Sequence, residues 1–114
     1  PKIFHVNWFR TDDNGNFIWP GFGDNLRVVD WILARCEGKV DADLTAIGYV
    51  PKPEDINIEG LDGVTVDTIR DLLSVDVESW KADCENIKAF YEQIGDRVPA
   101  ELHEELNALI ARLG

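Results

Sequence analysis

The chain has 114 residues, the size of one ordinary domain, and its hydrophobic content of 45% is enough for a folded core and argues against general disorder. Twenty-two acidic and eleven basic residues give a net charge of −11, which repels nucleic-acid backbones and anionic membrane surfaces. No run approaches the ~20 apolar residues of a membrane span and no signal peptide is visible, so we expect a cytoplasmic protein without a nucleic-acid or membrane partner.

The amino-terminal segment predicts an aromatic β-hairpin. Residues 2–9 alternate like a strand, Asn14-Gly15 is a strong hairpin signal, and residues 17–19 are expected to return antiparallel. A strict two-residue Asn14-Gly15 loop would place Phe9 and Phe17 on opposite faces. A bulge, a longer loop or a break before Phe17 would bring the two rings to one face, and the sequence leaves these three alternatives open.

An unusual aromatic run follows the turn, and it ends at the mouth of a helix. The run is Phe17-Ile18-Trp19-Pro20-Gly21-Phe22-Gly23-Asp24-Asn25. Its proline and glycines should end the backbone hydrogen bonding of the hairpin. Glycines beside aromatic residues are typical of a backbone that lets the rings stack on a planar ligand such as a base. Stacking on aromatic rings contributes roughly 1–3 kcal/mol per base without discriminating between bases. Selectivity therefore requires a polar group, and Asn25 is the candidate.

A helix is predicted after this run, with Asp24 or Asn25 as its cap and Gly38 at its end. If Asn25 is the cap, its side chain is partly committed to the backbone, which competes with a role in reading a base. The predicted buried face has helical spacing, and Val28 and Trp31 widen it. Its other members are Val29, Ile32, Leu33 and Cys36.

The rest of the chain predicts a connection followed by helices. Residues 38–63 are mostly irregular, with a short strand at 45–50 and an acidic loop at 55–63 whose isoleucines and leucine point inward. Thr65 or Asp67 should cap a short helix, and Asp76 a longer one that ends at Gly95. The inward stripe of the longer helix is Trp80, Cys84, Ile87, Tyr91 and Ile94. Pro99 fits the first position of a last helix lined by Leu102, Leu106, Leu109, Ile110 and Leu113.

No set of residues in the chain predicts catalysis or metal binding. Cys36 and Cys84 form no Cys-x-x-Cys pair and are expected to be free and buried, which fits a reducing compartment. His103 begins a near match to a zinc-protease motif, but Asn107 replaces the second histidine, so a solvated histidine is the better interpretation. His5 is expected to be a packed or surface histidine. There is no Gly-x-x-x-x-Gly-Lys-Ser/Thr phosphate loop.

Residues 1–10 and 14–25 together closely resemble the carboxy-terminal part of the GTP-dependent phosphoenolpyruvate carboxykinases, and looser similarity extends through residues 47–51 and the helical tail. The resemblance implies that Phe9, Phe17 and Phe22 surround the guanine of GTP or GDP and that Asn25 hydrogen-bonds the edge of the base. Gly23 and Asp24 belong to the same loop, and Trp19 supports it.

The resemblance also implies what the parent protein does. The family converts oxaloacetate and GTP to phosphoenolpyruvate, GDP and carbon dioxide with Mn²⁺ and Mg²⁺, whose ligands, like the phosphate loop, lie upstream of this segment. Because family members are several times longer, and because the chain starts at Pro1 in an apolar run, we expect a fragment that is inactive alone, associates with the remainder of its parent and is prone to self-association.

The expected fold class is α+β, a fragment of a larger α/β lobe. Residues 1–25 are predicted to form the guanine-pocket hairpin and loop, residues 26–63 a helix and connection, and residues 64–114 the helical tail. The alternative is a stand-alone interaction module whose aromatic hairpin packs on a partner protein, because aromatic clusters beside Pro-Gly turns usually serve packing.

Overall fold

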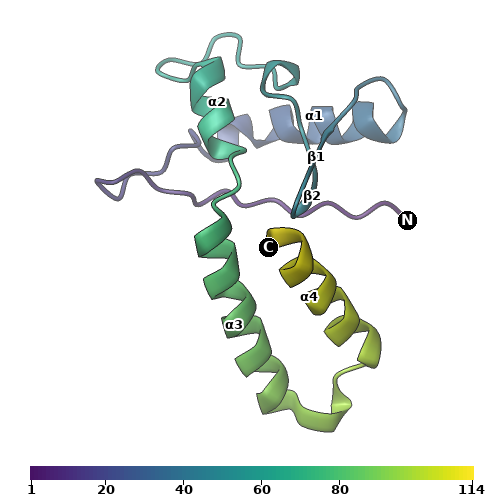
Figure 1. Cartoon of the computed structure of the whole chain (residues 1–114). Helices are drawn as coiled ribbons and strands as arrows, with labels where there is room; N and C mark the ends of the chain where they lie inside the picture. Colours follow the sequence, from purple (N-terminus) through teal and green to yellow (C-terminus); the bar gives the residue numbers. More distant parts are fainter. The chain divides into compact units, whose positions relative to one another are not determined.

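The structure is a computed structural model that describes all residues, 1–114. It has the expected α+β composition, and it divides into two compact units (Figure 1). The first unit comprises residues 1–43 and 49–74, and the second comprises residues 44–48 and 75–114. The regular elements are α1 (Asn25–Cys36), β1 (Asp43–Thr45), β2 (Gly48–Val50), α2 (Val66–Leu72), α3 (Val77–Ile94) and α4 (Ala100–Leu113). No helix is both long and apolar enough to cross a membrane.

The amino-terminal strand predicted for residues 2–9 was wrong, because residues 1–10 contain no strand. A strand needs a partner for its backbone, and the returning segment leaves the pairing at Trp19-Pro20-Gly21, where proline removes a donor. Phe4 and Trp8 instead pack their rings against the core of the first unit. The chain does reverse as predicted, since Thr11 and Phe17 form an isolated antiparallel bridge.

The core of the first unit is built around two tryptophans. Its buried members are Trp19, Trp31, Ile56 and Ile69. Helix α1 is oriented with Trp31 in this core, so that Val28 and Ile32 also pack on it. Val29, Leu33 and Cys36 are exposed. The predicted burial of those last three residues was wrong. The residues at 28, 31 and 32 and those at 29, 33 and 36 both have helical spacing. The set that is packed in the core is the one that contains the largest ring, Trp31.

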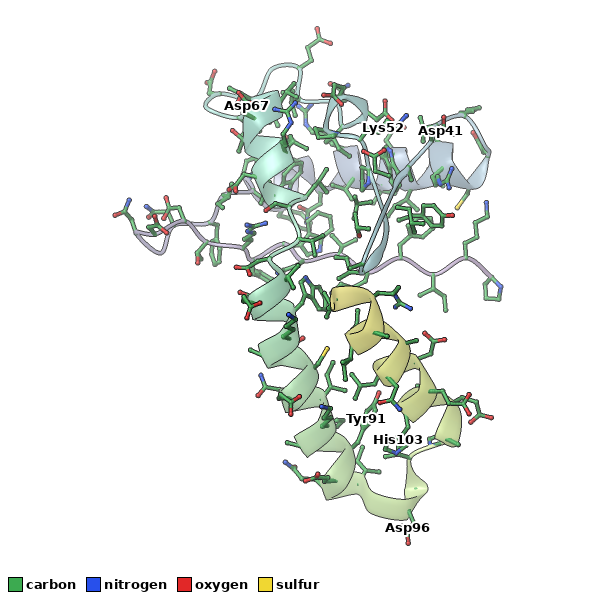
Figure 2. The ribbon with its side chains drawn as sticks, in the orientation of Figure 1. Asp41, Lys52, Asp67, Tyr91, Asp96 and His103 are labelled. Atoms are coloured by element: carbon green, nitrogen blue, oxygen red, sulfur yellow. The ribbon has the colours of Figure 1, made fainter.

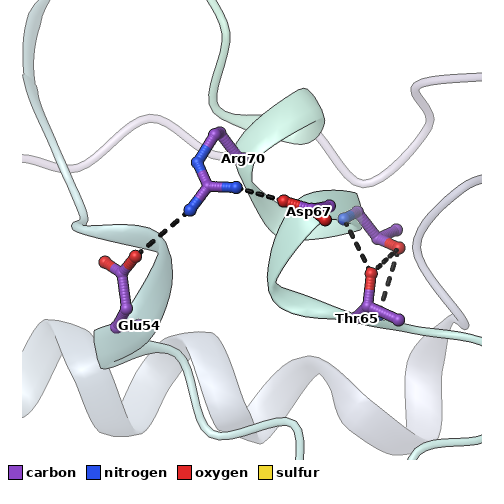
Figure 3. Close-up of polar contacts among 5 residues, drawn as sticks. Glu54, Thr65, Asp67 and Arg70 are labelled. Carbon is purple, nitrogen blue, oxygen red and sulfur yellow. Dashed lines mark hydrogen bonds and ion pairs between the residues drawn. The ribbon is translucent and has the colours of Figure 1, made fainter.

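In the remainder of the first unit, the predicted cap of α2 is confirmed. Thr65 caps α2, because its hydroxyl accepts the Thr68 N–H while the Thr68 hydroxyl accepts the Thr65 N–H (Figure 3). Arg70 lies between two carboxylates, bonding Asp67 and, at 3.3 Å, Glu54 (Figure 3). The single strand expected at 45–50 is instead two three-residue strands joined by a two-residue turn.

The second unit is dominated by the predicted helical hairpin, in which α3 and α4 run antiparallel (Figure 1). Asp76 caps α3 by accepting the Ser79 N–H at 3.1 Å, and Gly95 ends it with φ +69°. Tyr91 and His103 meet edge to face across the hairpin, with ring centroids 5.2 Å apart (Figure 2). The hairpin is therefore closed by ring packing near its turn.

The core of the hairpin is small and apolar. Its buried residues are Cys84, Leu106 and Leu113, and the partly buried side chains around them include Trp80, Ile87, Tyr91, Leu109 and Ile110. Leu102, predicted to face inward, is 45% exposed and lies in the first turn of α4, so that prediction was wrong. Pro99 precedes α4 as its N-cap residue, one position before the predicted one.

Candidate functional site

The turn that carries the aromatic segment is held by one carboxylate. Asp12 accepts the backbone N–H groups of Asn14 and Asn16, each at 2.9 Å, and the Gly15 N–H donates to the Asp12 carbonyl at 3.0 Å. The bond from Asn16 is the main cause that lowers the pKa of Asp12 below its ordinary value of 3.8. Gly15 adopts φ +81°, which glycine tolerates without strain. The turn is thus a hydrogen-bonded unit of residues 12–16.

This turn determines the pairing register of the two segments on either side of it, which the sequence left open. The loop is longer than the two-residue Asn14-Gly15 loop. The Thr11–Phe17 bridge is flanked by two backbone hydrogen bonds, Ile18 N–H to the Arg10 carbonyl at 3.0 Å and Asp12 N–H to the Asn16 carbonyl at 2.9 Å. In this register residues 9 and 17 share a face. Their rings meet edge to face, with centroids 5.9 Å apart and an interplanar angle of 61°.

Arg10 ties the segment to the carboxyl end of α2. Its guanidinium donates to the carbonyls of Asp71 at 2.6 Å and Leu72 at 3.1 Å, and to the Ser74 hydroxyl at 3.2 Å. A cation at the carboxyl end of a helix satisfies carbonyls that lack intrahelical partners and complements the helix dipole. The backbone next to Phe9 is therefore fixed although it belongs to no strand.

The three candidate phenylalanines all present their rings to solvent. Phe9 is 69% exposed, Phe17 64% and Phe22 93%. Phe22 lies in a single 3₁₀ turn, Phe22–Asp24, which Gly21 introduces with φ +113° and ψ −160°, a conformation restricted to glycine. The structure brings Phe9 and Phe17 into contact, whereas Phe22 makes no ring contact with either of them.

Asp24 occupies the N-cap position of α1, one of the two predicted positions, but neither Asp24 nor Asn25 makes the expected capping hydrogen bond with its side chain. The helix grows out of the 3₁₀ turn, and this turn already satisfies the first amides: the Asp24 N–H donates to the Gly21 carbonyl and the Asn25 N–H to the Phe22 carbonyl. The Asp24 carboxylate instead pairs with Arg27 Nε at 3.0 Å. Capping therefore does not compete for the side chain of Asn25.

The Asn25 side chain is held by Trp19. The indole Nε1 of Trp19 donates to Asn25 Oδ1 at 2.9 Å, and Trp19 itself is only 6% exposed. Trp8 covers the Trp19 ring, with centroids 6.4 Å apart at 39°. Trp19 thus belongs to the core beneath the exposed rings and supports the loop through Asn25.

An open groove of about 430 Å³ runs beside the loop, and sequence reasoning missed its central residue, Arg27. Arg27 joins the 22–24 turn to the connection, since its Nη1 donates to the Asn57 carbonyl at 2.9 Å while Nε holds Asp24. The i, i+3 spacing from Asp24 was the available signal. The groove is lined by Gly23, Asp24, Leu26, Arg27, Asp30, Asn57 and Glu59, so the exposed phenylalanines lie outside it.

The remaining candidate groups do not form a reactive site. No group of three or more His, Cys, Asp or Glu side chains is arranged to hold a metal ion, so the residues present do not fit Mn²⁺ or Mg²⁺. Cys36 is exposed, contrary to expectation, and Cys84 is buried as predicted; both are free. His5 is exposed, as is His103 despite its contact with Tyr91.

Comparisons with known proteins match almost the entire chain to one family. The family model described as the phosphoenolpyruvate carboxykinase C-terminal P-loop domain matches residues 1–112. The chain is 48% identical to phosphoenolpyruvate carboxykinase [GTP] of Treponema pallidum (strain Nichols), 48% to that of Renibacterium salmoninarum and 47% to that of Ascaris suum.

These alignments cover 99–100% of this chain but 17–19% of the relatives, so the chain spans about a fifth of their length. The identity is high and continuous enough to place the aromatic segment and both units in one homologous region. The chain belongs to the GTP-dependent phosphoenolpyruvate carboxykinase family, within its C-terminal domain.

Proposed function

We propose that this chain is the guanine-binding segment of a longer, cytoplasmic, GTP-dependent phosphoenolpyruvate carboxykinase. The longer enzyme converts oxaloacetate and GTP to phosphoenolpyruvate, GDP and carbon dioxide. Residues 1–25 supply the site, residues 26–63 form the helix and connection that follow it, and residues 64–114 form the helical tail. The observation that carries the proposal is the exposure of three phenylalanine rings, by 64–93%, on a backbone fixed by hydrogen bonds.

Exposed rings on a fixed backbone favour binding, because the segment loses little further conformational entropy when a ligand binds. The contact between Phe9 and Phe17 orients both rings before a ligand arrives, and Gly21 directs the backbone of Phe22. Each stacked ring contributes on the order of 1–3 kcal/mol without distinguishing one purine from another. Asn25 contributes the hydrogen bond to the base edge, and Gly23 and Asp24 form the loop between Phe22 and Asn25.

The charge of the chain limits its role to the base. With a net charge of −11, this segment attracts no triphosphate, so cations for the phosphates must come from elsewhere in the enzyme. Mn²⁺ and Mg²⁺ bound outside this segment would neutralise the phosphate and oxyanion charges. The residues described above bind and orient the guanine, remote from the transferred phosphoryl group.

Alanine substitution in the full-length enzyme tests the proposal. Phe22→Ala should raise KM for GTP and ITP alike, by an amount corresponding to about 1–3 kcal/mol, with a smaller change in kcat. Phe90→Ala is the matched control, because Phe90 is also 57% exposed but lies on α3 in the second unit. Phe90→Ala should leave KM unchanged.

A GDP titration monitored by tryptophan fluorescence complements the kinetics, since Trp19 reports through its bond to Asn25. A saturable change that Phe22→Ala weakens and Phe90→Ala does not would support the site. The absence of a saturable change, together with an unaltered KM in Phe22→Ala, would favour a protein-interaction surface instead.

A further inference from the structure

The Asn25 side chain has two chemically different ends, and the structure holds them in one orientation. Its Oδ1 accepts the Trp19 indole N–H at 2.9 Å in a partly buried bond, and its Nδ2 makes no hydrogen bond within the chain. An indole nitrogen can only donate, so only the oxygen end of the amide suits it. The two N–H groups of Nδ2 are left for a ligand.

Rotating the amide by half a turn would bring Nδ2 against the indole N–H, so that two donors would face each other. Trp19 is 6% exposed, and water does not readily replace the lost partner of a buried donor. Leaving such a donor unpaired is unfavourable, so the bond selects one of two amide orientations. A free asparagine on a surface has no such preference.

We propose that Trp19 is a positioning residue that makes the site selective for 6-oxopurines over 6-aminopurines. The inference rests on the proposed function, in which Asn25 contacts the base edge. Guanine and hypoxanthine carry an acceptor oxygen at the 6-position, which Nδ2 can satisfy, whereas adenine carries an amino donor there. An asparagine free to turn would offer Oδ1 to adenine equally well. Trp19 removes that option without touching the ligand.

The chain contains a matched control for removing the indole N–H. Trp31 is buried to a similar degree, 5% exposed, and packs in the same core as Trp19, but its Nε1 has no hydrogen-bond partner within the chain. Trp19→Phe and Trp31→Phe therefore both shrink a ring in that core. Only the first breaks a bond to Asn25.

The experiment measures kcat/KM of the full-length enzyme with GTP, ITP and ATP. Trp19→Phe should narrow the preference for GTP over ATP by about two- to tenfold, the range of one net hydrogen bond, and should act mainly through KM. The preference for GTP over ITP should not change, because both bases carry the 6-oxo group. Trp31→Phe should leave both ratios unchanged, even if it lowers stability as much.

A second arm separates this inference from the proposed function. In an Asn25→Ala background, Trp19→Phe should have no further effect on the GTP-to-ATP ratio, since no amide remains to be oriented. If Asn25→Ala alone narrows the ratio but Trp19→Phe and Trp31→Phe behave alike, the positioning role is overturned while the guanine contact stands. If Asn25→Ala leaves the ratio unchanged, both are overturned.

Should Trp19→Phe fail to fold, 3-benzothienylalanine at position 19 repeats the test without the loss of volume. This analogue replaces the N–H by sulfur and keeps the bicyclic ring. The same narrowing of the GTP-to-ATP ratio is expected, and an unchanged ratio in a folded enzyme overturns the proposal.

Discussion

The helical hairpin of α3 and α4 buries the apolar stripe between its helices, whereas the aromatic segment of residues 9–25 buries Trp19 but leaves its three phenylalanines exposed. In the hairpin, the side chains that recur at helical spacing are mostly covered, and Cys84, Leu106 and Leu113 form a closed core. In the aromatic segment, the three phenylalanines remain 64–93% exposed. Apolar burial normally supplies the stability of a fold, so rings left outside while their backbone is held in place point to a role in binding.

The two regions also hold their backbones differently. Regular helices satisfy their own amides and carbonyls, and the hairpin adds a cap at Asp76 and a glycine with positive φ, Gly95, at the end of α3. The aromatic segment depends on single side chains instead: Asp12 closes its turn, Arg10 anchors it to α2, and Trp19 links it to α1. A substitution in the hairpin should therefore cost stability, whereas one in the segment should cost ligand binding.

The largest effect is expected in the hairpin core. Leu106→Ala removes a side chain that is 7% exposed, and such truncations cost about 2–5 kcal/mol. Amide hydrogen exchange in the full-length enzyme should show faster exchange in α3 and α4, while KM for GTP stays within twofold of the unsubstituted enzyme. A large rise in KM for GTP would contradict the proposed division of roles between the two regions.

Leu102→Ala is the control for that prediction, because Leu102 lies on the same helix but is 45% exposed. Its truncation should cost well under the ~2 kcal/mol at the lower end of the core range. Equal effects of the two substitutions would mean that α4 packs through a different face.

The sequence predicted the helical half of the molecule well because local signals decide it. Caps at Thr65 and Asp76 and the ending of α3 at Gly95 are confirmed, since each depends on residues within one turn of the helix end. The inward stripe of α3 is confirmed at Cys84, because 3.6-residue spacing is a property of the chain alone.

The predictions were wrong where local sequence patterns allow more than one structure and tertiary contacts determine which one forms. Both stripes of α1 have helical spacing, and only the packing of Trp31 shows that Val29 and Leu33 face outward. The strand at residues 2–9 had the right alternation but no partner. The Trp19–Asn25 bond spans six residues in an irregular loop, so no periodicity indicated it. The roles of the site residues remain predictions.

The next largest effect concerns the backbone that places Phe22. Gly21 has φ +113° and ψ −160°, and a side chain there costs on the order of 1–3 kcal/mol of strain, although a Cβ atom would meet no other atom within 4 Å. Gly21→Ala should shift the 22–24 turn and raise KM for GTP in the full-length enzyme, with kcat less affected. An unchanged KM would show that the placement of the ring does not depend on this glycine.

Gly95→Ala gives the corresponding change in the hairpin, because Gly95 also has positive φ, +69°, and open space around its Cβ position. It should speed amide exchange at the end of α3 and leave KM for GTP unaltered. The pair of glycine variants thus separates backbone strain in general from strain that acts on the aromatic segment.

The smallest effect is the pH response of the turn at residues 12–16. The folded-state pKa of Asp12 lies below its ordinary value of 3.8, first because its carboxylate accepts the Asn16 N–H. A depressed carboxyl pKa stabilises the turn above the unfolded pKa, and that stabilisation is lost as pH falls through the folded pKa. Titrating the 114-residue chain by NMR should shift the Asn14 and Asn16 amide signals with a midpoint below pH 3.8. Asp12→Asn offers an amide oxygen that does not titrate, so it should keep the turn and abolish the shift, whereas the same shift in both chains would mean that another group closes the turn.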